Sequence, residues 1–319
     1  MKSHPVVSVI MPAYNAADTL LESVSSVLAQ SMGELELIVC DDASTDATPV
    51  LLAAIDDPRL KFIRNPSNLG AGPSRDRAIE QASAPWVAFI DADDVWLPER
   101  LERLLRAVED APDRLVFDDI MTCHSVAGKL VPWRRVHGNN AFGGNGPERR
   151  DIHIENYVSS PRLIMQPLIP LAFIRQAGLR HSNRSFGEDA EYFLHLALAG
   201  VGFRYLPEPL YLYRVQPGSA TAKAGAAQMR ECIESCAALE GWSNDVQAAF
   251  KRKIESLRHN ETLYSVAQHL RSGRLLSAMR QLVLDPAALG ILPSRLIRHL
   301  AYQLHRLRHG GSSRSPGGR

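Results

Sequence analysis

Acidic side chains gather directly after a predicted buried strand in the first third of the chain. Residues 86–90 form an apolar run typical of a strand, and Asp91, Asp93 and Asp94 follow it at once. Aspartate is disfavoured inside strands, so these side chains should lie where the strand ends and its loop begins. Clustered carboxylates repel one another unless a proton or a cation lies between them. The spacing therefore predicts a site for a hard divalent cation, with room left for phosphate oxygens.

Two further acidic clusters occupy comparable places. Asp41 and Asp42 follow another apolar run, and Glu188 and Asp189 open a predicted helix. The carboxyl ends of parallel strands converge on one crevice, so we expect the three clusters to meet there. A cation at this crevice would neutralise the charge that builds on a departing diphosphate, and a spare carboxylate would accept a proton from an attacking hydroxyl. The arrangement suits transfer of a group activated by a nucleoside diphosphate.

Strand and helix patterns alternate in the segment that must position these clusters. β-branched and apolar runs predict strands at residues 6–11, 35–40, 60–63 and 86–90. Helical spacing and capping residues predict helices between and after them, including residues 73–81 and 97–108. Short connections and this alternation predict an α/β fold, with a mostly parallel sheet and helices on both of its faces.

The pattern is looser in the second half of the chain. Residues 121–160 are rich in Gly, Asn, Pro and Arg and predict an irregular insertion. Residues 203–206 and 210–214 predict two short strands separated by prolines. We expect three parts: a nucleotide-binding and catalytic domain at residues 1–220, a helical extension at 221–309, and a disordered Gly/Ser/Arg-rich tail at 310–319.

Composition narrows the classes of protein. The chain has 319 residues, 45% of them hydrophobic, and a formal net charge of +1, so nothing favours a disordered chain or a nucleic-acid partner. Its four cysteines are scattered and predict no disulfide framework, which fits a reducing cytoplasm. No stretch reaches the length of a membrane span, and the N-terminus lacks an apolar signal core.

Six short motifs in this order resemble family 2 glycosyltransferases of the GT-A fold. The motifs are Val7 to Asn15, Asp41 to Asp46, Asn68-Leu69-Gly70 with Arg75, Asp91 to Asp94 with Pro98, Gly187 to Glu191, and Glu208 to Arg214. The likeness covers residues 6–220 and is greatest to bacterial enzymes that build exopolysaccharide, capsule or lipopolysaccharide repeat units. The resemblance implies a GT-A, Rossmann-like nucleotide-binding fold and an inverting transfer of one hexose-type sugar.

The resemblance also implies roles for individual residues. The nucleotide-sugar donor, expected to be UDP-linked, would bind at Pro12, Tyr14, Asn15, Asp42, Asn68, Arg75, Asp91 and Asp93. Within that set, Asp42 would read the base. Asp94, with Asp93, would hold Mn²⁺ or Mg²⁺, and Asp94 is the expected direct ligand. Asp189 would be the general base, with Glu188 beside it. The acceptor would be a glycan or a lipid-linked glycan.

Two departures from the family pattern bear on these roles. Many relatives carry a histidine two residues after the tyrosine-arginine pair that ends at Arg214, and here Gln216 takes that place, which leaves the inner metal shell open. The Gln-x-x-Arg-Trp signature of processive synthases is absent, so we expect one sugar per encounter.

Other interpretations of the same residues stand beside these. Asp41 and Asp42 could cap a helix through a turn. A nucleotidyltransferase or a non-catalytic nucleotide-sugar binding module could share the fold, although the Gly-rich basic signature of nucleotidyltransferases is missing after the first strand. Beyond residue 270, arginines interleave with leucines and isoleucines against one acid, Asp285. This segment predicts either peripheral contact with an anionic membrane or a helix with a solvated basic face.

Overall fold

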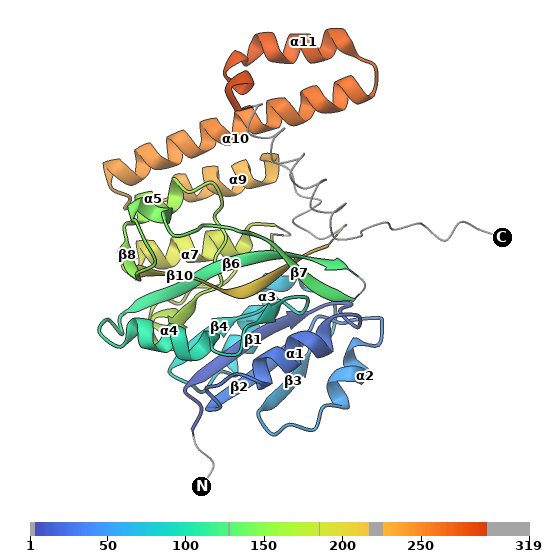
Figure 1. The fold of residues 1–319 in the computed structure, drawn as a ribbon, viewed down its shortest axis with the longest axis vertical. Coiled ribbons are helices and arrows are strands. Elements are labelled where there is room, and N and C mark those ends of the chain that lie inside the picture. Colours follow the sequence, from blue (N-terminus) through green and yellow to red (C-terminus); the bar gives the residue numbers. More distant parts are fainter. Residues whose placement is uncertain (1–3, 127, 185, 217–225, 292–319) are drawn as a thin grey trace, which may run out of the picture.

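The computed structural model describes residues 4–126, 128–184, 186–216 and 226–291. Within them the chain forms one mixed, mostly parallel ten-stranded sheet flanked by helices, with a helical layer at one end (Figure 1). The strand order is β3-β2-β1-β4-β9-β6-β10-β5, and β7 and β8 pair with β6 and β10. The α/β class predicted from the sequence is confirmed.

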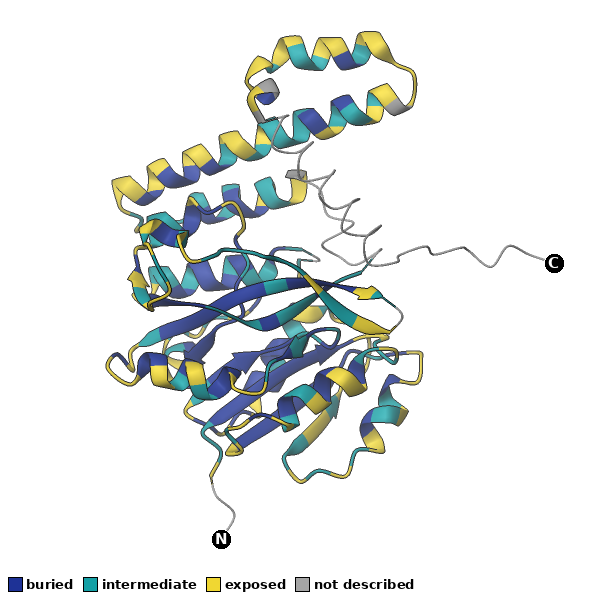
Figure 2. Ribbon diagram, in the orientation of Figure 1, coloured by how far each residue is buried: buried dark blue, intermediate teal, exposed yellow. Residues whose placement is uncertain are grey.

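The N-terminal half of the sheet is parallel and buried. Its strands are β1 (Val7–Ala13), β2 (Leu35–Asp41), β3 (Leu60–Arg64) and β4 (Trp86–Phe89). The helices that connect them are α1 (Leu20–Leu28), α2 (Thr48–Ala53) and α3 (Ala71–Glu80). β1 and β2 are buried along their whole length, in dark blue in Figure 2, as expected for strands covered on both faces.

Hydrophobic side chains alternate between the two faces of this sheet. On one face, Ile10 and Ile38 pack with Ala78 of α3. On the other face, Val9 and Leu37 pack with helix α1 and with α4 (Arg100–Val108). All the loops at the carboxyl ends of β1, β2 and β4 therefore emerge from a rigid, double-sided core.

The segment predicted to be an irregular insertion instead contains regular strands. β6 (Arg114–Val126) and β7 (Lys129–Arg135) form an antiparallel pair. β8 (Arg150–Ile152) pairs antiparallel with the later strand β10 (Gly202–Val215). A 3-10 turn at Ala141–Gly143 and the short helix α5 (Ile154–Val158) lie between and after them. The prediction was wrong here because pairing with neighbouring strands outweighs a local composition rich in turn formers.

One long strand, β10 (Gly202–Val215), replaces the two short strands predicted around Pro207 and Pro209. It runs parallel to β6, and the register shifts between Leu206 and Pro209 and again between Pro209 and Tyr211. These irregularities accommodate the prolines, which cannot donate to the ladder. β5 (Val95–Trp96) and β9 (Leu168–Pro170) complete the sheet in antiparallel pairings with β10 and β4.

The remaining helices lie in the second half of the chain, and those after residue 225 form the layer at one end of the molecule (Figure 1). They are α6 (Leu171–Ala177), α7 (Glu188–Leu198), α9 (Ala226–Ala237), α10 (Asn244–Arg271) and α11 (Leu275–Leu284), followed by the 3-10 segment η2 (Pro286–Ile291). The predicted helical extension is thus present between residues 226 and 291, and the predicted disordered tail at 310–319 lies outside the described residues. No described helix combines the length and the apolar character needed to cross a membrane.

Candidate active site

A cavity of about 430 Å³ opens at the carboxyl ends of β1, β2 and β4. Its walls include the loop after β1, the residue after β2 and the loop after β4. Six residues predicted to bind the donor line it: Pro12, Tyr14, Asn15, Asp42, Asp91 and Asp93. Gln216, which takes the place of the family's histidine, lines the same cavity.

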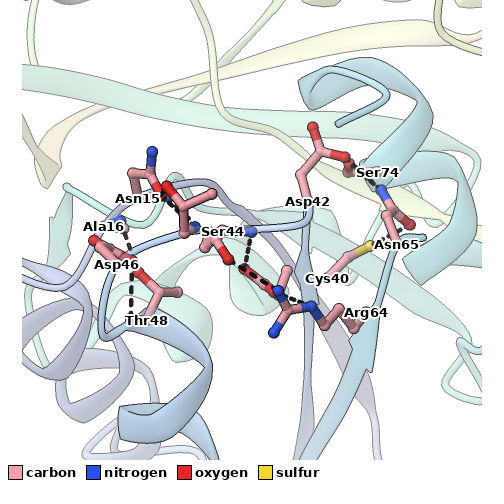
Figure 3. A network of polar contacts seen from close by, with 12 residues as sticks. Asn15, Ala16, Cys40, Asp42, Ser44, Asp46, Thr48, Arg64, Asn65 and Ser74 are labelled. Atoms are coloured by element: carbon pink, nitrogen blue, oxygen red, sulfur yellow. Dashed lines mark hydrogen bonds and ion pairs between the residues drawn. The ribbon is translucent and has the colours of Figure 1, made fainter. Parts of the chain in front are cut away.

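The loop after β1 is tied to the loop after β2 (Figure 3). The backbone N–H of Asn15 donates to Ser44 Oγ at 2.9 Å, and Asn15 Oδ1 accepts from the Thr45 backbone N–H at 2.8 Å. Asn15 and Ala43 both have positive φ, at 49° and 59°. Asparagine tolerates this left-handed conformation, whereas for alanine it is strained, as is common at binding sites.

Asp42 is buried in the cavity wall and is held there by three hydrogen bonds. Its carboxylate accepts from Asn65 Nδ2 at 2.6 Å and from the backbone N–H groups of Leu69 and Gly70, both at 2.8 Å. Asn68 itself is exposed and does not line the cavity. The loop that carries Asn68 is therefore held to the site through Asp42.

Arg75, on helix α3, joins two of the acidic clusters. Its Nη2 donates to Asp91 Oδ1 at 2.7 Å, and its Nη1 donates to Glu188 Oε1 at 2.8 Å. The Arg75 side chain is only 7% exposed. Burial alone would lower its pKa, but the charges of Asp91 and Glu188 hold that pKa above its ordinary value. Arg75 thus does not line the cavity, yet it fixes the acidic residues around it.

Asp91, Asp93 and Asp94, the strand-end cluster, divide into two environments. Asp91 and Asp93 are partly exposed in the cavity, whereas Asp94 is fully buried behind it. Burial, reinforced by Asp91, raises the pKa of Asp93 to about 6. Burial, reinforced by Asp93 and Asp91, also raises the pKa of Asp94.

Strand β10 occupies both oxygens of Asp94. The Tyr211 hydroxyl donates to Asp94 Oδ2 at 2.6 Å, and the Arg214 backbone N–H donates to Oδ1 at 2.8 Å. The Arg214 guanidinium donates to the Asp93 carbonyl at 2.6 Å and pairs with Glu22 of α1. Asp94 does not line the cavity, and both of its oxygens already accept hydrogen bonds, so its role as the direct metal ligand stays a prediction.

The helix-start pair, Glu188 and Asp189, opens helix α7. Gly187 precedes it with φ of 78°, a left-handed conformation that glycine adopts without strain. Its second residue, Asp189, accepts a hydrogen bond from the Ala190 backbone N–H at 2.7 Å. Burial, followed by the neighbouring charge of Glu188, raises the pKa of Asp189 to about 7, although Arg75 opposes the shift. Such a carboxylate can exchange a proton near neutral pH.

Helix α3 is also fastened to the segment that leads into α7. Asp76 accepts from the backbone N–H of His181 at 2.9 Å and contacts His181 Nδ1 at 2.6 Å. The His181 ring stacks on Tyr192 of α7, with centroids 3.9 Å apart. A Cβ at Gly72 would come within 2.5 Å of the Ser182 carbonyl oxygen, so the two segments approach as closely as glycine permits.

The residues present fit a divalent cation held only in part by protein. No group of three metal-ligating side chains comes together among the described residues. Asp91 and Asp93 nevertheless face one cavity, and the raised pKa of Asp93 reflects the burial and like charge that a cation would relieve. One or two carboxylates plus substrate phosphates are a usual magnesium site.

Several residues at the site were not predicted from the sequence to belong to it. Tyr211 lies in the motif from Glu208 to Arg214 without an expected role of its own, but its hydroxyl donates to Asp94. Gln166 donates to Asp91 at 3.3 Å from a segment without a motif, and Asp18 and Thr19 line the cavity. A buried polar strand residue such as Tyr211 is the one signal that could have been followed, since buried hydroxyls need partners.

Comparison with known sequences gives the chain a family. The model for "Glycosyl transferase family 2" matches residues 8–169, about half of the chain. The succinoglycan biosynthesis protein ExoO of Rhizobium meliloti is 27% identical over 98% of this chain and 91% of its own length. An Escherichia coli protein, WfgD, is 35% identical over 44% of this chain and 56% of its own length; its name describes a UDP-Glc:alpha-D-GlcNAc-diphosphoundecaprenol beta-1,3-glucosyltransferase.

Comparison with solved structures agrees on the fold. TarS of S. aureus, residues 1–349 in a crystal with UDP-GlcNAc, aligns with a TM-score of 0.64 at 19% identity, covering 85% of this chain and 79% of that one. The described sheet and its flanking helices thus share the α/β fold of that structure. The chain belongs to glycosyl transferase family 2.

Proposed function

We propose that this glycosyltransferase moves a sugar, with inversion, from a UDP-linked donor to a hydroxyl of a lipid-carried bacterial surface glycan. The name of the Escherichia coli relative specifies UDP-Glc and a diphosphoundecaprenol acceptor, and TarS was crystallised with UDP-GlcNAc. The relatives from Rhizobium meliloti are succinoglycan biosynthesis proteins. Such an acceptor would place the reaction at the cytoplasmic face of the membrane.

The observation that carries this proposal is the double contact of Arg75. It bonds Asp91, which lines the cavity, and Glu188, which adjoins Asp189 in sequence. One buried cation therefore links Asp91, on the donor side of the site, to Glu188, the neighbour of the candidate base. A nucleotide-binding module without catalysis would have no need of this second link.

The donor's nucleoside would lie against the loops after β1 and β2. Pro12, Tyr14 and Asn15 form one wall, and Tyr14 is 50% exposed, so its ring is free to contact a base or ribose. Asp42 would accept the base's ring N–H. Two backbone N–H groups and Asn65 already fix the orientation of that carboxylate, so it would be presented to the base without further ordering.

Asp93 and Asp91 would hold a divalent cation, Mn²⁺ or Mg²⁺, against the donor diphosphate. When bound, such an ion neutralises negative charge on the departing diphosphate. Asp94 would act behind them by fixing the loop to Tyr211 and Arg214. Gln216, which also lines the cavity, would offer a neutral amide where relatives carry a histidine.

Asp189 would take the proton from the acceptor hydroxyl as that oxygen attacks the sugar. Its pKa of about 7 leaves a large fraction ionised at neutral pH and makes it a stronger base than an ordinary aspartate. Glu188 would stay paired with Arg75, which separates the two neighbouring carboxylates into one fixed charge and one proton acceptor.

A donor panel followed by thermal unfolding tests the proposal. UDP-, GDP- and dTDP-sugars are added to the native chain with Mn²⁺ or with a chelator. At about 100 times its dissociation constant a ligand stabilises by about 2.7 kcal/mol, so a UDP-sugar should raise the melting temperature only when the metal is present. Equal shifts with every nucleotide, or none with any, would contradict the assignment. Transfer to a diphosphoundecaprenol-linked glycan then checks the acceptor.

A further inference from the structure

Helix α11 turns a row of large apolar side chains to solvent. Leu275, Leu276, Met279, Val283 and Leu284 are between 62% and 84% exposed, and we call them the α11 face. Ala278 is the one residue of this helix that is buried. Figure 2 shows the helix at the far end of the molecule, largely in the colours of exposed and partly exposed residues. A contiguous cluster of exposed apolar side chains on a protein surface marks an interaction site.

Four of the five side chains of the α11 face share one side of the helix, and Leu284 lies about 80° beyond them. At 100° per residue, Leu275, Leu276, Met279 and Val283 fall within an arc of about 100°. Ala278 falls outside that arc, on the side that packs on α10. These four side chains form an amphipathic stripe, because they are on one side and the buried Ala278 is on another.

Positive charge borders this stripe. Arg274, which precedes the helix, and Arg280, which lies beside the stripe, are both exposed, and Arg280 forms no ion pair within the described part of the chain. By sequence, residues 271–319 contain nine arginines and a single acid, Asp285. Because the whole chain has 36 basic and 35 acidic side chains, the remainder of the protein is net acidic. The apolar face thus lies in the one strongly basic region.

We propose that the α11 face rests on an anionic lipid bilayer, with its apolar side chains in the interface and its arginines at the phosphate level. The ten residues of α11 are about 15 Å long, half the hydrocarbon thickness, so the helix would lie along the surface. A second copy of the chain would bring arginine against arginine across a two-fold axis, and the chain's own later residues carry the same sign of charge. Anionic lipid satisfies both the apolar and the charged part.

Vesicle co-sedimentation of the full chain, without sugar nucleotide or acceptor, tests this inference independently of the reaction. Vesicles of phosphatidylcholine alone are compared with vesicles that contain roughly one-third phosphatidylglycerol. We expect binding to the anionic vesicles, weakened by salt. The triple variant Leu276→Ser, Met279→Ser, Val283→Ser should bind these vesicles at least roughly tenfold more weakly than the native chain. Val50→Ser, on α2 and 70% exposed, is the matched control and should bind as the native chain does.

Three outcomes would overturn the proposal. The first is equal binding of the native chain and the triple variant. The second is equal binding to neutral and anionic vesicles. The third is a native dimer in sedimentation velocity that the triple variant converts to monomer, which would assign the face to a second copy. Should the triple variant not fold by circular dichroism, Arg274→Gln with Arg280→Gln replaces it, and the same loss of binding to anionic vesicles is expected.

Discussion

The strand-end cluster and the helix-start pair are both partly buried acidic groups, but they are held in place differently. In the strand-end cluster, Asp94 has both oxygens occupied by Tyr211 and Arg214 of β10. In the helix-start pair, the one hydrogen bond that Asp189 accepts from the described residues comes from a backbone N–H of its own helix, while its neighbour Glu188 forms the ion pair with Arg75. Burial raises pKa values in both places. From this difference we predict that Asp94 holds the loop after β4 in place and that Asp189 takes part in proton transfer.

The largest effect is expected from Arg75→Gln, which removes the cation shared by the two clusters. Asp91 and Glu188 would each lose a charge partner, and truncating one member of a buried ion pair costs about 3–5 kcal/mol. Transfer should fall below detection, and chemical denaturation should report the lost stability. Arg180→Gln is the control, because its pair with Glu80 is 50–61% exposed and should contribute less than about 1 kcal/mol. Near-native transfer by Arg75→Gln would show that the link is not needed.

The next largest effect is the pH dependence of transfer, which tests the role of Asp189 separately from that of Asp94. Asp189 must be ionised to accept a proton, and its pKa is about 7. The rate of transfer should therefore rise about tenfold per pH unit below pH 7 and level off above it. A profile that is flat between pH 5 and pH 8 would remove Asp189 from this role.

The same group makes a stability prediction of definite sign. The pKa of Asp189 is raised on folding, so its favourable contribution is complete below the unfolded value near 4 and is lost as pH rises through about 7. Between pH 5 and pH 8 the native chain should thus lose stability relative to Asp189→Asn. Melting temperatures of both proteins across this range check the sign, and parallel curves would contradict it.

A smaller effect is expected from a substitution at the hydrogen bond between Tyr211 and Asp94. Tyr211→Phe removes the hydroxyl that donates to Asp94 at 2.6 Å and leaves one buried oxygen with fewer partners. We expect a loss of about 1–3 kcal/mol in the free energy of unfolding, with a modest effect on turnover. A variant with native stability but no transfer would instead place Asp94 in the chemistry.

The smallest effect tests how closely the two regions are packed. Gly72→Ala would push α3 against the Ser182 carbonyl and the Cβ of His181, at a cost of about 1–2 kcal/mol. Gly33→Ala is the matched control, since nothing lies within 4 Å of a Cβ built there. Equal melting temperatures for the two variants would show that the contact between α3 and the segment before α7 is loose.

The first half of the fold followed from the sequence because its signals are local. β1, β2, β3 and β4 begin and end close to the predicted residues, since each is an apolar run stopped by Asp, Asn or Pro. The β6–β7 hairpin was missed because its stability comes from neighbouring strands. The prolines of β10 were taken as breaks, whereas register shifts absorb them.

The site was predicted in its membership more than in its geometry. Pro12, Tyr14, Asn15, Asp42, Asp91 and Asp93 were placed together at the cavity by their motifs. The burial of Asp94 could not be read from Asp91 to Asp94, because it depends on Tyr211 and Arg214, more than a hundred residues away. The double contact of Arg75 depends in the same way on Glu188. The roles of these residues in catalysis stay predictions.

Calorimetric titration of a UDP-sugar into Asp93→Asn and Asp189→Asn, with and without Mn²⁺, tests the division between the two clusters most directly. Asp93→Asn should lose most of the metal-dependent binding. Asp189→Asn should bind the donor as the native chain does, yet fail to transfer the sugar. Donor binding that is lost in Asp189→Asn and kept in Asp93→Asn would contradict the account.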